Sequence, residues 1–127
     1  MSNVCYFEIP VQDMARAQSF YKDLFQWKFE KMEGCPDDVD YWSIQTGGSE
    51  KDYGVSCGGM MKKQNPNHSI TQYVGVESID ASIEKAQKLG GTMLMPKTAV
   101  AGKGYFSLFL DPEKNPFGIW QCDENAK

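Results

Sequence analysis

The sequence predicts an α+β domain made of two βαβββ modules, whose strands form a curved eight-stranded mixed sheet around a cavity, with the helices outside. The order of elements predicts this, because each half shows a strand, a helix and then three strands. An internal repeat supports it: Val11-Gln12-Asp13-Met14 aligns with Val76-Glu77-Ser78-Ile79 at an offset of 65 residues. One module alone leaves a sheet face uncovered, so two modules side by side are expected.

The chain of 127 residues has the length of one domain with its own hydrophobic core. We therefore expect a single domain over residues 1–127. Its first module covers about residues 1–61 and its second about residues 70–127. The polar stretch 62–69 (K-K-Q-N-P-N-H-S) is expected to link them.

The first module opens with a strand at residues 4–11 (V-C-Y-F-E-I-P-V), in which Tyr6 and Glu8 share one face. Asp13 is expected to cap a helix. Its apolar stripe is formed by residues 14, 17, 20, 21, 24 and 25. Further strands are expected at residues 27–32, 41–46 and 53–61, with a loop at 33–40 and a turn at 47–52.

The second module repeats this order. A strand is expected at residues 70–76, and Ser78 is expected to cap a helix that ends at Gly90-Gly91. A short strand at 92–95 and a loop at 96–104 follow. The last feature is a hairpin at residues 105–121, because two aromatic-rich runs flank the turn-forming segment D-P-E-K-N-P.

Composition excludes several classes of function. The net charge is −4 and the largest basic cluster is Lys62-Lys63, so we expect no nucleic-acid partner. No apolar run approaches the ~20 residues that span a bilayer, and the first residues show no signal peptide, so we expect no membrane partner and a cytoplasmic location. The four cysteines show no C-x-x-C pair and are expected to be free thiols, with Cys5 and Cys122 in the core.

Four passages carry a resemblance that covers most of the chain: F-E-I-P-V-Q-D-M-A-R-A-Q-S-F-Y-K-D-L-F-Q-W, G-G-M-M-K-K, Y-V-G-V-E-S-I-D-A-S-I-E-K-A-Q-K-L-G-G and F-L-D-P-E-K-N-P-F-G-I-W-Q. In combination they resemble the vicinal oxygen chelate superfamily, which includes glyoxalase I, extradiol dioxygenases and bleomycin-resistance proteins. The chain looks most similar to the branch described as predicted enzymes related to lactoylglutathione lyase. The resemblance implies homodimers and, in metal-using members, four His, Gln or Glu ligands on the first and last strands of each half.

The ligand positions that the resemblance implies carry other residues here. They fall on Tyr6, Thr71 and Gly118, and the fourth lies within residues 54–61, which contain no Asp, Glu or His. None of these is a usual ligand for zinc, nickel or iron. His68, the only histidine, lies in the polar loop and is expected to be solvated. We therefore expect no metal and no other cofactor.

Glu8 is the candidate catalytic residue, because a carboxylate among aromatic groups is expected to have a raised pKa and to serve as a general base. Its structural alternative is a buried glutamate held by backbone N–H groups or a lysine. The candidate ligand-binding residues that would line the cavity with it are Tyr6, Thr71, Tyr73, Trp120, Trp42 and Phe106. These rings can equally fill the interior. Lys97 and the loop 101–104 are expected to form a rim or to be solvated.

Three functions compete. The first is a metal-free protein that binds a small, apolar or aromatic molecule in the cavity. The alternative is an enzyme of the lyase, isomerase or dioxygenase type, with Glu8 as general base and an atypical divalent metal. The third is an interaction module that pairs as a homodimer. Fold alone does not decide among them.

Overall fold

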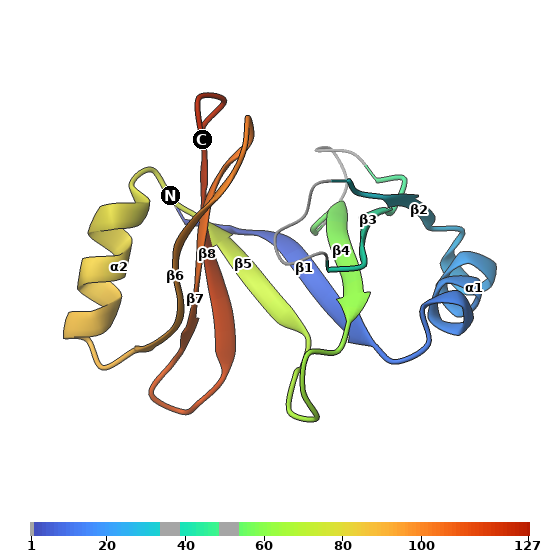
Figure 1. The fold of residues 1–127 in the computed structure, drawn as a ribbon, viewed down its shortest axis with the longest axis horizontal. Helices are drawn as coiled ribbons and strands as arrows, with labels where there is room; N and C mark the ends of the chain where they lie inside the picture. Colours follow the sequence, from blue (N-terminus) through green and yellow to red (C-terminus); the bar gives the residue numbers. More distant parts are fainter. Residues whose placement is uncertain (1, 34–38, 49–53) are drawn as a thin grey trace. The chain divides into compact units, whose positions relative to one another are not determined.

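The computed structural model describes residues 2–33, 39–48 and 54–127. Its strands are β1 (Val4–Val11), β2 (Lys28–Lys31), β3 (Tyr41–Gln45), β4 (Cys57–Lys62), β5 (Thr71–Gly75), β6 (Thr92–Val100), β7 (Gly104–Leu110) and β8 (Pro116–Cys122), and its helices are α1 (Met14–Phe25) and α2 (Ile79–Lys88) (Figure 1). These strands form one mixed sheet in the order β2-β3-β4-β1-β5-β8-β7-β6. The predicted fold class, an eight-stranded mixed sheet from two βαβββ modules, is confirmed.

The chain forms two compact units. The first, here the N-terminal unit, is Tyr6–Ile70, and the second, the C-terminal unit, is Thr71–Lys127 together with Met1–Cys5. The first residues join the C-terminal unit through β5, where the backbone N–H of Gly75 donates to the carbonyl of Asn3 at 2.9 Å. No helix in the described part of the chain has both the length and the apolar character needed to cross a membrane.

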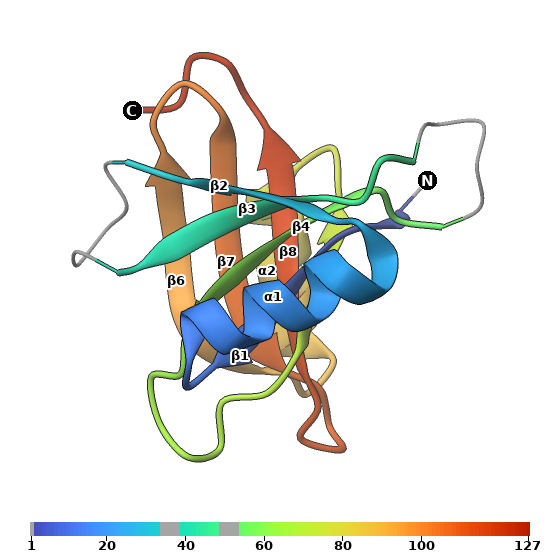
Figure 2. The same cartoon turned by 90° about the vertical axis from the view of Figure 1, so that its right-hand side faces the viewer.

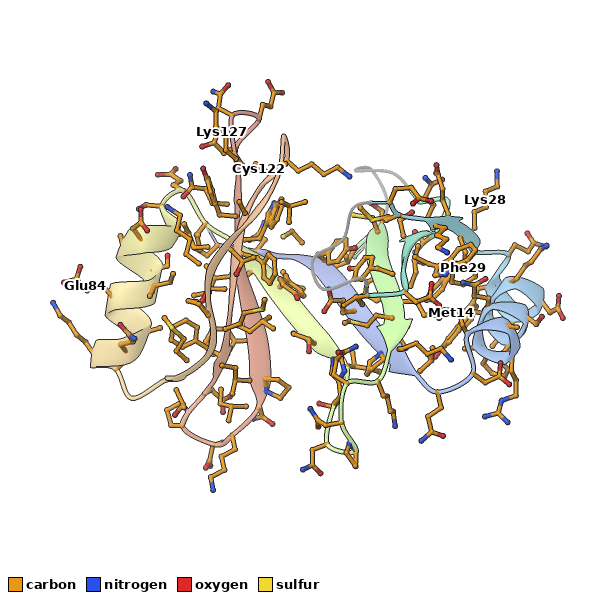
Figure 3. All side chains as sticks on the ribbon, in the orientation of Figure 1. Met14, Lys28, Phe29, Glu84, Cys122 and Lys127 are labelled. Carbon is orange, nitrogen blue, oxygen red and sulfur yellow. The ribbon has the colours of Figure 1, made fainter. Side chains whose placement is uncertain are left out.

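In the N-terminal unit, β1 pairs in parallel with β4, and β4 pairs antiparallel with β3. Helix α1 begins at its cap Asp13, whose carboxylate accepts the N–H of Arg16 at 2.9 Å. Figure 2 shows α1 lying across the strands of this unit. Its core consists of Ile9, Val11, Met14, Ile44 and Met60, with Phe29 packed against it, and Figure 3 labels Met14 and Phe29 there.

The C-terminal unit repeats this plan. Strand β5 pairs in parallel with β8, β8 pairs antiparallel with β7, and β7 with β6. Helix α2 begins at its cap Ser78, as predicted, and its residue Ile79 is fully buried against Phe109 and Ile119. The opposite side of α2 faces solvent, and Figure 3 labels Glu84 there. The Glu84 carboxylate pairs with the Lys88 ammonium at 3.2 Å. The predicted repeat therefore has the same strand pairing in both units.

The hairpin predicted at residues 105–121 is confirmed as β7 and β8. Asp111 organises its turn, because Oδ1 accepts the N–H groups of Glu113 and Asn115, each at 2.8 Å. These bonds lower the pKa of the Asp111 carboxyl below its ordinary 3.8. Lys114 takes the positive φ of 67° that this tight connection needs.

The prediction of a loop at residues 96–104 was wrong. Strand β6 continues to Val100, and only residues 101–103 form the turn into β7. Pro96 is tolerated because β6 is the last strand in the sheet order and its pairing is irregular between Met95 and Thr98. Lys97 lies in this strand, where its ammonium pairs with Asp80 at 3.2 Å and lies 4.5 Å from the ring centre of Tyr105.

Three smaller expectations from the sequence also differ from the structure. Strand β4 begins at Cys57, not at residue 53, which lies outside the described residues. The helical stripe is only partly in the core: Ala17 and Tyr21 pack on it, but Phe20, Leu24 and Phe25 are 58%, 57% and 52% exposed. Cys5 and Cys122 are exposed, contrary to the prediction, and Cys35 lies outside the described residues.

Candidate functional site

Tyr6, Tyr41 and Glu8 form a hydrogen-bonded trio on the face of the N-terminal unit's sheet that α1 does not cover. The Tyr41 hydroxyl donates to Oε2 of Glu8 at 2.9 Å. It also lies 2.6 Å from the Tyr6 hydroxyl. Because Tyr41 has one hydroxyl hydrogen and gives it to Glu8, Tyr6 must donate to Tyr41. The trio is thus a directed chain from Tyr6 through Tyr41 to Glu8.

Strand register places the three side chains on one face. Tyr6 and Glu8 share a face of β1, because residues two apart in a strand point to the same side. Across the sheet, Glu8 pairs with Gly59, and Gly59 with Ser43, which shares its face with Tyr41. The predicted facing of Tyr6 and Glu8 therefore holds, and Tyr41 joins them from β3.

Gly59 makes room for the trio. It lies on β4, between the strands that carry Tyr41 and Glu8, and a Cβ there would collide with the ring and hydroxyl of Tyr41. Without a side chain at this position, the Tyr41 ring can lie over β4 and reach the carboxylate two strands away. Gly59 is buried by this arrangement. The tyrosine ring therefore explains why this position is a glycine.

The charge of Glu8 affects Tyr41. Burial raises the pKa of the Tyr41 phenol well above its ordinary 10.0, and the neighbouring Glu8 and Tyr6 raise it further. Tyr41 is therefore a neutral hydroxyl at any pH near neutrality. It can hold the Glu8 carboxylate in place by donating a hydrogen bond, but it cannot accept a proton as a base.

In the C-terminal unit, four predicted ligand-binding residues share the sheet face that α2 does not cover. Register pairs Tyr73 with Gly118 and Phe106 with Trp120, and Thr71 lies two residues before Tyr73. The rings of Tyr73 and Phe106 meet edge to face, with centroids 6.4 Å apart. Trp120 donates its Nε1–H toward the sulfur of Cys122 at 3.2 Å. Tyr73 and Thr71 are buried, at 5% and 6% exposure.

Gly118 and Tyr73 are matched in shape. A Cβ at residue 118 would collide with the Tyr73 ring. This is the position where the resemblance implies a metal ligand in other members. Here a neighbouring aromatic ring occupies the space that a ligand side chain would need.

Trp42 is the predicted site residue that lies apart from the others. It pairs with Met60 and packs against the core under α1, on the opposite face from Glu8. Its Nε1–H donates to the Asp40 carboxylate at 3.0 Å. Alternation along β3 explains this placement, because Tyr41 and Trp42 are neighbours and must face opposite sides.

The positions implied for metal ligands do not supply a usual donor set. Within residues 2–33, 39–48 and 54–127, no group of three His, Cys, Asp or Glu side chains is arranged to hold a metal ion. His68 lies in the 62–69 loop, where its Nδ1 accepts the N–H of Gln64 at 3.2 Å. Partial burial lowers the pKa of its imidazole, and Lys63 lowers it further. His68 therefore acts as a loop acceptor for Gln64.

Tyr41 is the member of the candidate site that the sequence did not single out. Its strand was predicted, yet its hydrogen bonds to Tyr6 and Glu8 depend on the register of β3, β4 and β1. These two partners lie 35 and 33 residues from Tyr41 in the sequence. The glycine pair Gly58-Gly59 was the available signal. Glycines inside a strand indicate a bulge or a close approach, without indicating what approaches.

Comparison with known proteins identifies the family. A family model described as bleomycin resistance protein-like N-terminal matches residues 3–47. A glyoxylase-like domain-containing protein from Didymella fabae is 30% identical over 114 residues, which cover 88% of each chain. The chain belongs to the glyoxalase and bleomycin-resistance (vicinal oxygen chelate) superfamily. The resemblance inferred from the four sequence passages is thereby confirmed.

Two further proteins are similar to this chain, one in sequence and one in fold. A putative glyoxylase, CFP32, from Mycobacterium tuberculosis is 22% identical over 120 residues, which make up 94% of this chain but 46% of the relative. The chain thus spans about half the length of the curated relatives that it matches first. Methylmalonyl-CoA epimerase from Mycobacterium tuberculosis superposes with a TM-score of 0.71 at 10% identity, covering 94% of this chain and 87% of that one. The second likeness concerns the fold alone.

Proposed function

We propose that this protein binds a small molecule with an apolar or aromatic body, and that the trio of Tyr6, Tyr41 and Glu8 supplies its polar contact. The observation that carries the proposal is the hydrogen bond from Tyr41 to Glu8, which fixes a carboxylate among aromatic groups on the sheet face that α1 does not cover. Apolar and aromatic side chains with a few convergent polar groups are typical of the lining of ligand sites. The proposal assigns no metal to the site.

The trio favours a ligand that donates a hydrogen bond. Glu8 as a carboxylate only accepts, and a carboxylate can accept about four hydrogen bonds in all. A phenolic hydroxyl or an amine on an aromatic body can donate to such an acceptor and stack on the tyrosine rings. We therefore expect phenols to bind better than their methyl ethers.

The experiment is a titration of the ¹⁵N-labelled chain with 1-naphthol and, separately, with 1-methoxynaphthalene. The proposal predicts saturable shifts at the amides of Tyr6, Glu8 and Tyr41 with 1-naphthol, and weaker ones with the ether. In the same spectra, the indole Nε1–H signal of Trp120 reports independently on the sheet face of the C-terminal unit that α2 does not cover. Amides of the trio that stay unmoved by every aromatic probe would reject the proposal.

An enzyme with Glu8 as general base is the second candidate. The same Tyr41–Glu8 bond favours it, because a base must be held in a fixed position to take a proton. The names of a putative glyoxylase and of methylmalonyl-CoA epimerase among the similar proteins motivate lyase and epimerase assays, with and without added divalent metal. Turnover that disappears in Glu8→Gln but survives in Glu30→Gln would favour the enzyme. Equal turnover in both variants would reject Glu8 as the base.

Pairing into a homodimer is proposed on a separate observation. Helix α1 leaves the apolar side chains of Phe20, Leu24 and Phe25 more than half exposed, and apolar patches of this kind mark contact surfaces. Light scattering of the purified chain measures its mass in solution. We expect Leu24→Glu to lower that mass to one chain, while Leu94→Glu, at an exposed leucine of β6, leaves it unchanged. A monomeric wild type would overturn this proposal.

A further inference from the structure

The C-terminal unit contains an apolar groove on its helix side, separate from the faces discussed above. The groove has a volume of about 340 Å³ and lies between α2, the ends of β5 and β8, and the turn at Asp111-Pro112. Its floor includes Val74, Phe117 and Ile119. By strand alternation these residues point away from the face of Tyr73, Phe106 and Trp120. The groove thus belongs to neither the trio nor the aromatic face.

The groove exists because α2 packs mainly over β6, β7 and β8. Val74 on β5, and Val76 just after that strand, therefore line the groove beside these contacts. Leu89, at the end of α2, also lines the groove and is 69% exposed. The wall is almost wholly carbon, and its volume falls in the range of about 300–1,000 Å³ that ligand pockets occupy.

Two charged residues border the groove, and only one is available to a ligand. Asp111 is engaged in its own turn: Oδ1 accepts two backbone N–H groups and Oδ2 accepts the Asn115 side chain at 3.1 Å. Lys85, in contrast, makes no ion pair with any residue in the described ranges 2–33, 39–48 and 54–127. Since the wall is almost wholly carbon, we infer that Lys85 lines it with its methylene groups and that its ammonium lies at the mouth.

We propose that this groove binds a small amphiphile with an apolar body and one carboxylate, such as a medium-chain fatty acid. The apolar body would cover Val74, Phe117 and Ile119, and the carboxylate would pair with the Lys85 ammonium at the mouth. Burial of the carbon wall supplies most of the affinity, at about 25 cal/mol per Å². The charge selects the acid over an amine of the same length.

The experiment titrates the full ¹⁵N-labelled chain with octanoate, octan-1-ol and octylamine. We expect saturable shifts at Val74, Ala86 and Ile119, with octanoate binding most tightly and octylamine least. The amides of Tyr6 and Tyr41 should stay unmoved, so this result is independent of the proposed phenol site. Equal binding of octanoate and octylamine, or shifts that do not saturate, would overturn the proposal.

Two variants test the assignment. Lys85→Gln should weaken octanoate about threefold, as expected for an exposed ion pair, and leave octan-1-ol unchanged. Lys88→Gln is the matched control, because Lys88 is already paired with Glu84 on the same helix. Ser82→Trp should fill the groove and abolish octanoate binding. Ala86→Leu is the second filling variant, and the melting temperature of each variant shows whether it folds. Undiminished octanoate binding in a folded filling variant would place the ligand elsewhere.

Discussion

The hydroxyl of Tyr41 donates to Oε2 of Glu8 at 2.9 Å, although the two residues lie on strands separated by a third. Neighbouring strands lie about 4.8 Å apart, so the tyrosine must extend across β4 to reach the carboxylate. It can do so because residue 59 is a glycine. The position of Glu8 therefore depends on three strands at once.

Removing the Tyr41 hydroxyl tests this dependence. Tyr41→Phe should lower the free energy of unfolding by about 1–3 kcal/mol, because a partly buried carboxylate loses a hydrogen bond and Tyr6 loses its acceptor. Urea unfolding measures the change. Tyr21→Phe, at a tyrosine of α1 that packs against the core of the same unit, is the matched control and should have a smaller effect. Equal losses in the two variants would mean that the trio adds no stability.

Alkaline pH should destabilise the protein through Tyr41. The folded state raises the pKa of this phenol above 10.0, so it binds the proton more tightly than the unfolded chain does. The stabilisation is fully present below pH 10 and is lost as the pH rises above it. Melting temperatures between pH 8 and 11.5 should fall more steeply for the wild type than for Tyr41→Phe. Parallel curves would contradict the assigned shift.

Gly59→Ala should displace Tyr41 without disrupting the backbone, because the added Cβ meets the far end of a side chain. We expect a loss of about 1–3 kcal/mol, typical of an added methyl group in a packed site. In the Tyr41→Ala background the same substitution should cost much less, since the ring is gone. A double-mutant cycle by urea unfolding measures this coupling, and additive losses would show that Gly59 serves another purpose.

Gly118→Ala should destabilise the C-terminal unit, because its Cβ collides with the buried Tyr73 ring. The expected loss is again about 1–3 kcal/mol. Tyr73→Ala should relieve the collision in the double variant. If Gly118→Ala unfolds at the same urea concentration as the wild type, the ring does not occupy the ligand position of the metal-using relatives.

Local signals predicted much of the fold. Asp13 and Ser78 cap the two helices, and the Asp111 turn joins β7 and β8, because each acts through residues two to four positions away. Pro96 misled the prediction of β6, since a proline excludes a central strand but is tolerated in the last strand of a sheet. Phe20 and Leu24 fit a helical stripe, yet the sheet covers only part of its width.

The site was predictable only in part. Strand alternation sufficed to group Tyr6 with Glu8, and Tyr73 with Thr71, because it needs no knowledge of pairing. Tyr41 required the register of three strands, which no local pattern contains. The facing of Trp42 depends on the same register, and the structure places it in the core under α1.

The most direct test of the proposed function compares the affinity of 1-naphthol for the wild type, Glu8→Gln and Glu30→Gln, by amide shifts. Glu30 is the control because it is an exposed carboxylate on β2 of the same unit. Losing a charged acceptor should weaken binding about tenfold in Glu8→Gln, the equivalent of roughly 1.4 kcal/mol, and leave Glu30→Gln unchanged. Equal affinity in all three proteins would contradict the claim that Glu8, held by Tyr41, is the polar contact of a ligand site.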